Sequence, residues 1–276
     1  MKKPTRIIIV SIIIFLLAFI IFNRFFDVKP IRKPLFIAHA GGGINGLIYL
    51  NSLEAINHNY EFGLRYFEMD FNWTSDNELV LIHDWSRTYQ RLFGKSSKEP
   101  PTLKEFMTFE MSFSQTQLSL NQFANWMENH PDAILVADIK KNNLEGLKKI
   151  IKTIKNPYQR IIPQMYKLEE YQQIINLGFN KKNIMFAMYK TLELNSDIVE
   201  FLKTKELYAI SVQPKKEYFE TLLKQFGFRD LTIYTLTLNN PEEFQKLVNE
   251  GVDGTVTDYM YLSDNKILSH RNQVLN

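Results

Sequence analysis

Two acidic residues stand two positions apart in the apolar run Tyr66-Phe-Glu68-Met-Asp70-Phe71. In a β-strand, residues at this spacing project from the same face, so the two carboxylates would lie side by side. Adjacent ionised carboxylates repel each other strongly unless a cation lies between them. The run therefore predicts a cation site, and ligands that are all oxygens favour Mg²⁺ or Ca²⁺ over Zn²⁺.

The segment that follows adds a histidine to this pair. Residues 74–78 have the composition of a hairpin turn, and the apolar run that ends in His83 is the expected returning strand. A two-residue loop at Asp76-Asn77 would place His83 opposite Asp70, on the same face of the hairpin. The hairpin would then assemble the groups needed for metal-assisted acid–base chemistry.

Two further motifs carry groups of the same kind. His39 stands where an apolar run enters the glycine-rich turn Gly41-Gly-Gly43. The backbone N–H groups of such a turn can contact a phosphate, although many glycine-rich turns serve only the backbone geometry. Asp138 and Lys140 end another apolar run and would share one face, either within the same site or as an internal salt bridge.

The remaining ionisable candidates are expected to play smaller parts. Asp84 would point to the other side of its strand, where it either orients His83 or pairs with Arg87. The other three histidines stand in polar contexts or in the terminal segment and are expected at the surface: His58, His130 and His270.

Nine apolar runs are predicted to be strands, and they alternate with segments of helical periodicity. The gap between the second and third runs is too short for a parallel crossover, so the third is the return arm of the hairpin and eight strands remain. This alternation over roughly 240 residues predicts an α/β fold, a (β/α)₈ TIM-type barrel, with a doubly wound open sheet as the alternative. The strand runs are 35–38, 66–71, 79–82, 134–139, 161–166, 184–189, 207–212, 232–238 and 252–257; the helical segments include 144–154, 168–177, 197–203, 216–226 and 241–250.

In such a barrel, chemistry gathers at the C-terminal ends of the strands. The polar residues predicted at these ends are His39, Glu68, Asp70, Asp138 and Asn239. The least regular stretch, residues 85–131, is expected to be an insertion over this face. Its aromatic residues would either line a substrate groove or build a small core of the insertion itself.

The N-terminus differs from the rest of the chain. Residues 7–22 are apolar apart from Ser11 and follow Lys2, Lys3 and Arg6. As a helix they would span roughly 24 Å, and no small-residue cleavage site follows, so an uncleaved transmembrane anchor is favoured over a cleaved signal peptide. The positive-inside rule then predicts a cytoplasmic tail at 1–6, a linker at 23–34 and an extracytoplasmic catalytic domain, periplasmic or extracellular.

The overall charge supports a mildly acidic folded part. Residues 1–34 contain seven Lys or Arg and one Asp, a net charge of +6, and the chain as a whole carries +3, which leaves −3 for the remainder. The basic balance therefore belongs to the N-terminus, and a nucleic-acid partner is not expected. The chain has no cysteine, which excludes disulfides and thiolate metal sites.

The ordered motifs of the chain resemble those of the glycerophosphodiester phosphodiesterase family. They are His39-x-Gly-Gly, Asn51-Ser with Glu54-Ala, Gly63-x₄-Glu68-x-Asp70, Thr74-x-Asp76, Val80-x-x-His83-Asp84, Pro101-Thr-Leu103, Asp138-x-Lys140, Thr237-Leu-Asn239-Asn-Pro-Glu-Glu243 and Gly251-Val-Asp-Gly254-x-x-Thr257-Asp258. They extend over residues 35–262, leaving 263–276 as a tail. The resemblance implies a phosphodiesterase barrel shared with phosphatidylinositol-specific phospholipases C, and a divalent cation as cofactor.

By position, the resemblance also implies roles for individual residues. His39 and His83 would be the catalytic acid and base, and Glu68, Asp70 and Asp138 would hold the metal. Lys140, Asn51, Gly41 and Asn239 would contact the phosphate or the rest of the substrate. Five positions depart from the family pattern: Ala40 replaces an arginine, Tyr49-Leu50 replaces Pro-Glu, Asp138 replaces a glutamate and Leu236 replaces a tryptophan.

Three functions remain open from the sequence. The first is a membrane-anchored, metal-dependent hydrolase of glycerophosphodiesters or of a related phosphodiester in a lipid or surface polymer. The second is a phospholipase-C-like lyase that stops at a cyclic phosphate, and the third is a non-catalytic binding module. The acidic cluster argues against the third, because buried carboxylates without a cation have no structural benefit.

Overall fold

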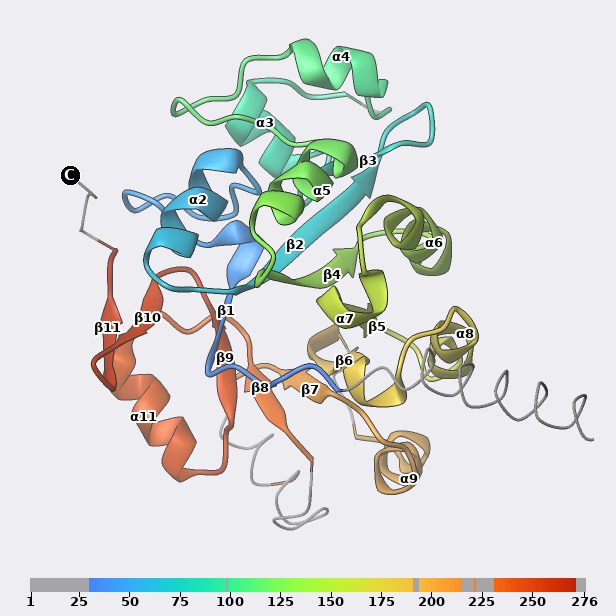
Figure 1. The fold of residues 1–276 in the computed structure, drawn as a ribbon, viewed down its shortest axis with the longest axis vertical. Coiled ribbons are helices and arrows are strands. Elements are labelled where there is room, and N and C mark those ends of the chain that lie inside the picture. Colours follow the sequence, from blue (N-terminus) through green and yellow to red (C-terminus); the bar gives the residue numbers. More distant parts are fainter. Residues whose placement is uncertain (1–29, 98, 191–193, 215–220, 222–230, 272–276) are drawn as a thin grey trace, which may run out of the picture.

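Eight parallel strands close into a barrel in the computed structural model, which describes residues 30–97, 99–190, 194–214, 221 and 231–271 (Figure 1). Each strand pairs with the next around the sheet, and β1 pairs with both β2 and β9. The sheet is therefore closed, which confirms the barrel and excludes the open sheet. The strands are β1 (Phe36–Ala38), β2 (Tyr66–Trp73), β4 (Ile134–Ile139), β5 (Ile161–Met165), β6 (Met185–Ala187), β7 (Ala209–Val212), β8 (Ile233–Thr235) and β9 (Gly254–Thr257).

The alternation of side chains along the strands decides what fills the barrel. One apolar cluster takes residues from all eight strands and forms the interior: Ile37, Tyr66, Val136, Ile162, Met185, Ala209, Tyr234 and Val256. Because side chains alternate with a period of two, Glu68 and Asp70 share the inward face of β2 with Tyr66. The inward positions thus change from apolar near the N-terminal end of the barrel to acidic toward its C-terminal end.

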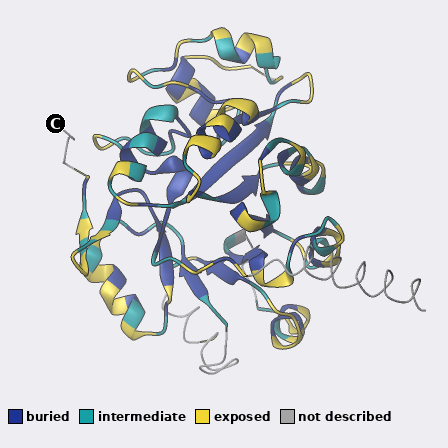
Figure 2. Cartoon of the chain, viewed as in Figure 1, coloured by how far each residue is buried: buried dark blue, intermediate teal, exposed yellow. Residues whose placement is uncertain are grey.

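Helices cover the outside of the sheet and bury their apolar faces against it (Figure 2). Side chains cap several of them: Ser52 at α2, Ser119 at α5, Asn195 at α9 and Asn240 at α11. The helices are α2 (Leu53–Glu61), α5 (Leu120–Asn129), α6 (Asn143–Thr153), α7 (Pro157–Arg160), α8 (Glu170–Asn176), α9 (Ser196–Thr204) and α11 (Pro241–Asn249), with 3₁₀ turns η1 (His39–Gly41), η2 (Lys181–Asn183) and η3 (Met188–Lys190). The helix predicted at 216–226 lies outside the described residues, apart from position 221.

The hairpin after β2 exists, but its register differs from the prediction by one residue. Phe71 pairs with Leu81 of β3 (Leu79–Leu81), and Ile82 donates its N–H to the Asp70 carbonyl. The loop contains three residues because Asn77 adopts a left-handed conformation, φ 60°, which asparagine tolerates. His83 therefore does not lie opposite Asp70; it follows the end of β3.

Only part of the predicted insertion, residues 85–131, lies outside the barrel pattern. Two helices, α3 (Arg87–Phe93) and α4 (Leu103–Thr108), lie outside the barrel pattern, whereas α5 packs into the main core as a barrel helix. The aromatic side chains of Tyr89, Phe93 and Phe106 are buried together in a separate small core. The simpler of the two sequence alternatives, an insertion with its own core, accounts for these three residues.

The predicted tail contains ordered structure. Strand β10 (Met260–Ser263) pairs with β11 (Lys266–Ser269), and His270 follows as a fully buried residue. Nε2–H of His270 donates a 2.9 Å hydrogen bond to the Asn59 amide oxygen of α2, and the ring centroids of His270 and His58 are 4.9 Å apart. The surface prediction for His58 and His270 is wrong, because the hairpin folds back over α2 and covers both rings.

Three tyrosines fasten the chain to the N-terminal end of the barrel. The hydroxyls of Tyr66 and Tyr208 donate to the Arg32 carbonyl over 2.7 and 2.8 Å, and the Tyr234 hydroxyl donates to the Pro34 carbonyl. Residues 1–29, which include the predicted tail, the predicted anchor and most of the linker, lie outside the described residues. Among the helices that are described, none has the length and apolar character needed to cross a bilayer.

Candidate active site

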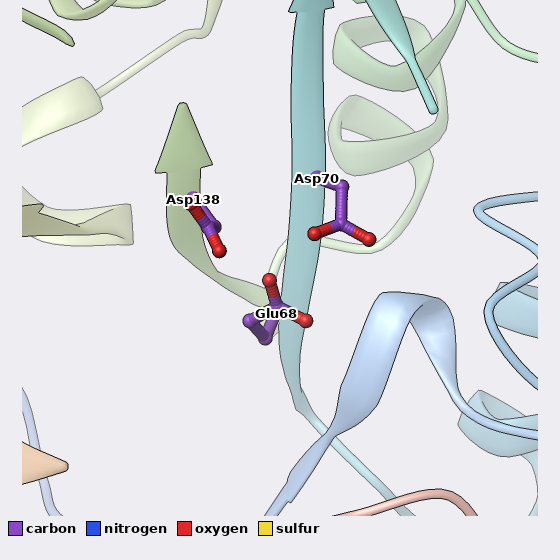
Figure 3. A group of neighbouring side chains, drawn as sticks. All are labelled: Glu68, Asp70 and Asp138. Carbon is purple, nitrogen blue, oxygen red and sulfur yellow. The ribbon is translucent and has the colours of Figure 1, made fainter. Parts of the chain in front are cut away.

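Three buried carboxylates meet near the C-terminal end of the barrel (Figure 3). Glu68 and Asp70 come from β2, and Asp138 is the parallel register partner of Asp70 on β4. One oxygen from each lies within 4.8 Å of the others. The Glu68 carboxylate also accepts a 2.8 Å hydrogen bond from the Ala40 N–H, which fixes its position.

This donor set fits a hard divalent cation. Two oxygens bound to one Ca²⁺ at about 2.4 Å can be at most about 4.8 Å apart, and Mg²⁺ requires somewhat closer ligands. Burial, and then the charge of Asp70, raise the pKa of Glu68 to about 8. Both causes disfavour the charged form of Glu68, and a bound cation would restore it.

Lys140 lies against the same cluster. Its ammonium group is 2.5 Å from Asp70 Oδ1 and 2.7 Å from Asp138 Oδ2, so the predicted shared face of Asp138 and Lys140 is confirmed. Burial lowers the pKa of Lys140, but the charges of Asp70 and Asp138 outweigh it and raise the pKa above its usual value. Lys140 remains charged and balances only one of the three carboxylates.

Polar side chains hold two of the carboxylates by hydrogen bonds. The hydroxyls of Tyr166 and Tyr189 both donate to Asp138, the latter over 3.1 Å. The Asn51 amide donates to Asp70 Oδ2 over 2.8 Å and accepts from the Asp70 N–H over 3.0 Å. Asn51 therefore orients a carboxylate of the cluster.

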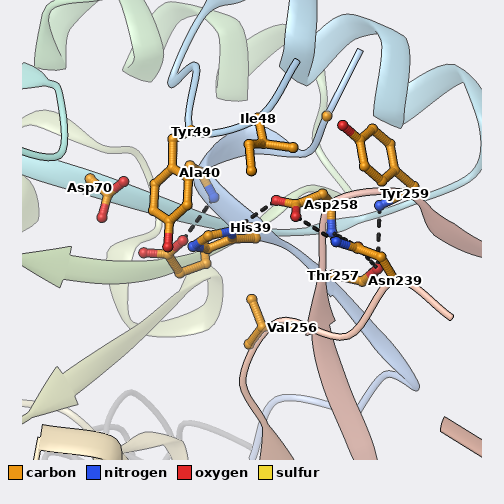
Figure 4. A network of polar contacts seen from close by, with 12 residues as sticks. His39, Ala40, Ile48, Tyr49, Asp70, Asn239, Val256, Thr257, Asp258 and Tyr259 are labelled. Atoms are coloured by element: carbon orange, nitrogen blue, oxygen red, sulfur yellow. Dashed lines mark hydrogen bonds and ion pairs between the residues drawn. The ribbon is translucent and has the colours of Figure 1, made fainter. Parts of the chain in front are cut away.

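His39 follows β1 and is oriented by a carboxylate that follows β9, the last strand of the barrel (Figure 4). Its Nδ1 lies 2.8 Å from Asp258 Oδ1, and the Asn239 amide donates to the other oxygen of Asp258 over 2.7 Å. Burial lowers the pKa of His39, but the hydrogen bond to Asp258 and the nearby charge of Glu68 raise it to about 9. With Nδ1 engaged, Nε2 is the nitrogen available to a bound molecule.

His83 is oriented in the same way. Its Nδ1 lies 2.9 Å from Asp84 Oδ2, so Asp84 orients the histidine, the first of its two sequence alternatives. Asp84 also accepts from the hydroxyls of Ser86 and Thr88 over 2.6 and 2.7 Å, and these contacts lower its pKa against the opposing effect of burial.

The two histidines, the three carboxylates and Lys140 all line one cavity of about 360 Å³. Tyr49 forms part of its wall, with its ring 4.3 Å from the ring of His39 and 5.3 Å from that of His83. The other lining residues are Gln164, Met185, Tyr189, Ser211, Gln213, Pro214, Leu236, Thr237 and Val256. Two acid–base groups and a cation site thus face one space, an arrangement suited to cleavage of a phosphate ester.

Comparison with known proteins identifies the chain. The model of the glycerophosphoryl diester phosphodiesterase family matches residues 42–262. The chain belongs to this family. Its predicted class, a phosphoric diester hydrolase, is therefore confirmed, and enzymes of the family depend on divalent cations.

Solved structures of low sequence identity share the barrel fold. A glycerophosphodiester phosphodiesterase from Thermotoga maritima has 22% identity and a TM-score of 0.64, over 82% of this chain and 95% of that chain. One from Parabacteroides distasonis has 18% identity and a TM-score of 0.62, over 82% and 94%. A phosphodiesterase from Oleispira antarctica, in complex with the product sn-glycerol-3-phosphate, has 15% identity and a TM-score of 0.63, over 82% and 93%.

Within this glycerophosphodiester phosphodiesterase barrel, the glycine-rich turn serves packing. The N–H groups of Gly42 and Gly43 donate to the carbonyls of His39 and Asp258 over 2.7 and 2.6 Å, so neither is available to a phosphate. A Cβ on Gly42 would lie 2.2 Å from the Asn59 amide. Gly41, with φ +85°, would meet Ile56 at 2.9 Å and is not part of the cavity wall. The alternative that the glycines serve backbone geometry accounts for these contacts.

The structure separates the predicted substrate-contacting residues into two groups. Lys140 lines the cavity, whereas Asn51 and Asn239 stand behind Asp70 and Asp258 and are absent from its wall. Sequence reasoning missed Asp258 and Tyr49 as site residues. Asp258 follows a strand end, as the other site residues do, and that signal was present in the sequence; Tyr49 lies in a loop with no local signal.

Proposed function

We propose that this chain is a membrane-anchored, metal-dependent hydrolase of glycerophosphodiesters or of a related phosphodiester from a lipid or a surface polymer. One observation carries the proposal: two histidines, each oriented by a carboxylate, face a cavity that also contains three buried carboxylates and a lysine. This set provides an acid, a base and a charged group for the phosphate.

His39 and His83 divide the proton transfers between them. When a free hydroxyl stands next to the phosphodiester, the neutral form of His39, which is the minor form at neutral pH with a pKa of about 9, takes its proton at Nε2 as the oxygen attacks phosphorus. His83 protonates the leaving oxygen. Glu68, Asp70 and Asp138 would hold Mg²⁺ or Ca²⁺, which when bound stabilises negative charge on the phosphoryl oxygens. Lys140 adds a second positive charge beside the same oxygens.

The cavity wall favours an uncharged alcohol that carries hydroxyl groups. Among the described residues, Gln164 Oε1 and Ser211 Oγ are buried and have no hydrogen-bond partner, and both residues line the cavity. Buried polar atoms require partners, which substrate hydroxyls would supply. The sn-glycerol-3-phosphate in the Oleispira antarctica structure supports a glycerol ester as the first substrate to test.

The membrane part of the proposal rests on the sequence. Residues 7–22 have the apolar character of an anchor and follow three cationic residues, which favours an extracytoplasmic barrel. A reporter fused after Asn276 that requires the far side of the membrane should be active. Cytoplasmic reporter activity, or a mature N-terminus near Arg24, would contradict this topology.

The reaction is tested with a panel of phosphodiesters that either carry or lack a hydroxyl next to the ester. Each is assayed with Mg²⁺, with Ca²⁺ and with EDTA. We expect turnover of glycerophosphodiesters with a metal, none in EDTA, and sn-glycerol-3-phosphate as the final product. Accumulation of a cyclic phosphate would identify a lyase instead, and metal-independent binding without turnover would identify a binding module.

A further inference from the structure

The Tyr49 ring contacts both candidate acid–base histidines. It makes edge contacts with both imidazoles, at centroid distances of 4.3 Å to His39 and 5.3 Å to His83, and lines the cavity. Figure 4 shows the ring standing beside His39. Among the described residues, the Tyr49 hydroxyl has no hydrogen-bond partner. The cavity wall thus contains a neutral donor whose hydrogen is not used by the protein.

The backbone holds Tyr49 in an unfavourable conformation. Its φ is 54°, in the left-handed region, where a bulky residue without a compensating contact is rare. Arg91 donates one hydrogen bond to the Ile48 carbonyl and one to the Tyr49 carbonyl, both 2.9 Å long. Leu50 is buried in the small core beside α3. The residues on both sides are therefore fixed, and the ring is held in the cavity at a cost in strain.

The flanking histidines indicate what this hydroxyl would contact. An acid and a base that act on the leaving and attacking oxygens of one phosphorus lie toward opposite sides of it. A residue between them stands next to the remaining phosphoryl oxygens, on which charge develops. Of the described residues that line the cavity, Lys140 is the one with a permanent positive charge, and two carboxylates already contact it. A further hydrogen-bond donor at this position would therefore stabilise the charge that develops on the phosphoryl oxygens.

We propose that Tyr49 is a catalytic residue whose neutral hydroxyl donates a hydrogen bond to a non-bridging phosphoryl oxygen, between His39 and His83. This inference rests on the proposed phosphodiesterase function. No group is transferred by Tyr49, and its phenol keeps its proton throughout. The residue stabilises the transition state more than the bound substrate, so its effect should fall mainly on kcat.

The test compares Tyr49→Phe with the wild-type protein in Mg²⁺. Phenylalanine keeps the ring contacts and removes only the hydroxyl, so the melting temperature should not change. We expect kcat to fall by about 10²-fold, the typical effect of losing one oxyanion donor, with little change in KM. Tyr66→Phe is the matched control, because it removes a phenol hydroxyl at the other end of the barrel and should retain full activity.

Phosphorothioate diesters identify the atom that is contacted. Sulfur accepts hydrogen bonds poorly, so the loss caused by Tyr49→Phe should shrink for one of the two phosphorothioate diastereomers. An equal loss with both would contradict a contact to one phosphoryl oxygen. Wild-type kcat in Tyr49→Phe would overturn the proposal directly.

Binding of inorganic phosphate separates this inference from the proposed function. Inorganic phosphate carries more negative charge on its oxygens than a bound diester does and accepts a stronger hydrogen bond, so titration calorimetry in Mg²⁺ should show weaker phosphate binding by Tyr49→Phe, even if the wild-type protein cleaves no glycerophosphodiester. In that case the reaction would be wrong and the hydroxyl contact right. Turnover by the wild-type protein, with kcat and phosphate affinity both unchanged in Tyr49→Phe, would leave the function intact and overturn the role of Tyr49.

Discussion

His39 and Asp258 share a 2.8 Å hydrogen bond although they are 219 positions apart in the sequence. Closure of the barrel creates this pair, because Ala38 of β1 and Thr257 of β9 are register partners and the two residues follow them directly. The carboxylate that orients His39 is therefore in place only when the first and last strands of the barrel meet.

Replacing Asp258 by asparagine should test this pair. The variant loses the carboxylate that raises the pKa of His39, so that pKa falls from about 9. In a plot of kcat/KM against pH, the change caused by the titration of His39 should move to lower pH. The value of kcat should fall by about 10²-fold or more. Asp264→Asn, at an exposed turn, is the control. An unchanged pH profile in Asp258→Asn would exclude the pair from catalysis.

The stability of the metal-free protein should decrease as the pH rises. The pKa of His39 is raised from 6.5 to about 9, and that of Glu68 from 4.5 to about 8, so both groups bind protons more tightly in the folded state. Their stabilisation is present at low pH and is lost as the pH passes 8 and 9. Melting temperatures in EDTA should therefore fall between about pH 5 and 9.

Saturating Mg²⁺ should reduce this pH dependence, because a bound cation stabilises the charged form of Glu68. Glu68→Gln should reduce it in EDTA as well. Melting temperatures that are constant from pH 5 to 9 in EDTA would show that the carboxylate cluster does not carry the expected unbalanced charge.

Lys140→Met should have opposite effects on metal binding and on turnover. Without the ammonium group, the oxygens of Asp70 and Asp138 are freed for a cation, so Mg²⁺ or Ca²⁺ should bind more tightly. The metal-free protein should lose about 3–5 kcal/mol of unfolding free energy, as when one partner of a buried ion pair is removed. Calorimetric titration checks that metal affinity rises, and a phosphodiesterase assay checks that turnover falls. Weaker metal binding by the variant would contradict the prediction.

Tyr166→Phe should weaken metal binding without changing the ligands themselves. The Tyr166 hydroxyl donates to Asp138, and loss of such a supporting hydrogen bond commonly lowers metal affinity by about 10- to 100-fold. Tyr171→Phe removes a hydroxyl that donates to the Glu206 carbonyl and is the matched control. Equal metal affinities in the two variants would show that Asp138 needs no such support.

A good leaving group should distinguish the two histidines. A nitrophenyl ester leaves without a proton, so the variant that lacks the acid should recover much of its activity on this substrate. With His83 as the acid, His83→Ala is rescued and His39→Ala is not. Rescue of His39→Ala alone would reverse the assignment, and full activity of both variants on glycerophosphodiesters would exclude both residues.

The sequence predicted the barrel because its signals are local. Each strand is an apolar run, and β4 begins and ends at the predicted residues, Ile134 and Ile139. The carboxylate cluster was predictable for the same reason, since the spacing of Glu68 and Asp70 alone places both on one face.

Features that depend on backbone details or on distant segments were harder to predict. The predicted register of the hairpin was wrong because residues 75–77 suit either a two- or a three-residue loop. The left-handed conformation of Asn77 selects the three-residue loop. His270 appeared exposed because nothing nearby in the sequence shows that β11 folds over α2. Tyr49 was missed because its position between two histidines depends on three separate loops.

The three tyrosines that hold Arg32 and Pro34 have a further consequence for how the enzyme reaches its substrate. They fix the point where the N-terminal segment joins the barrel at the end opposite the cavity. Residues 23–29, fully extended, reach about 24 Å, whereas a compact domain of this length is about 45 Å across. If residues 7–22 span the membrane, this tether is too short for the barrel to rotate until its cavity faces the membrane.

An anchored enzyme would then hold its catalytic opening away from the bilayer, toward diesters that have left the lipid phase or that belong to polymers extending from the surface. A flexible Gly/Ser insertion of about 15 residues in the linker, which lengthens its reach, should increase cleavage of a diester embedded in the same membrane. Cleavage of a soluble diester should not change. Equal rates on the embedded diester with both linkers would show that the tether does not restrict access.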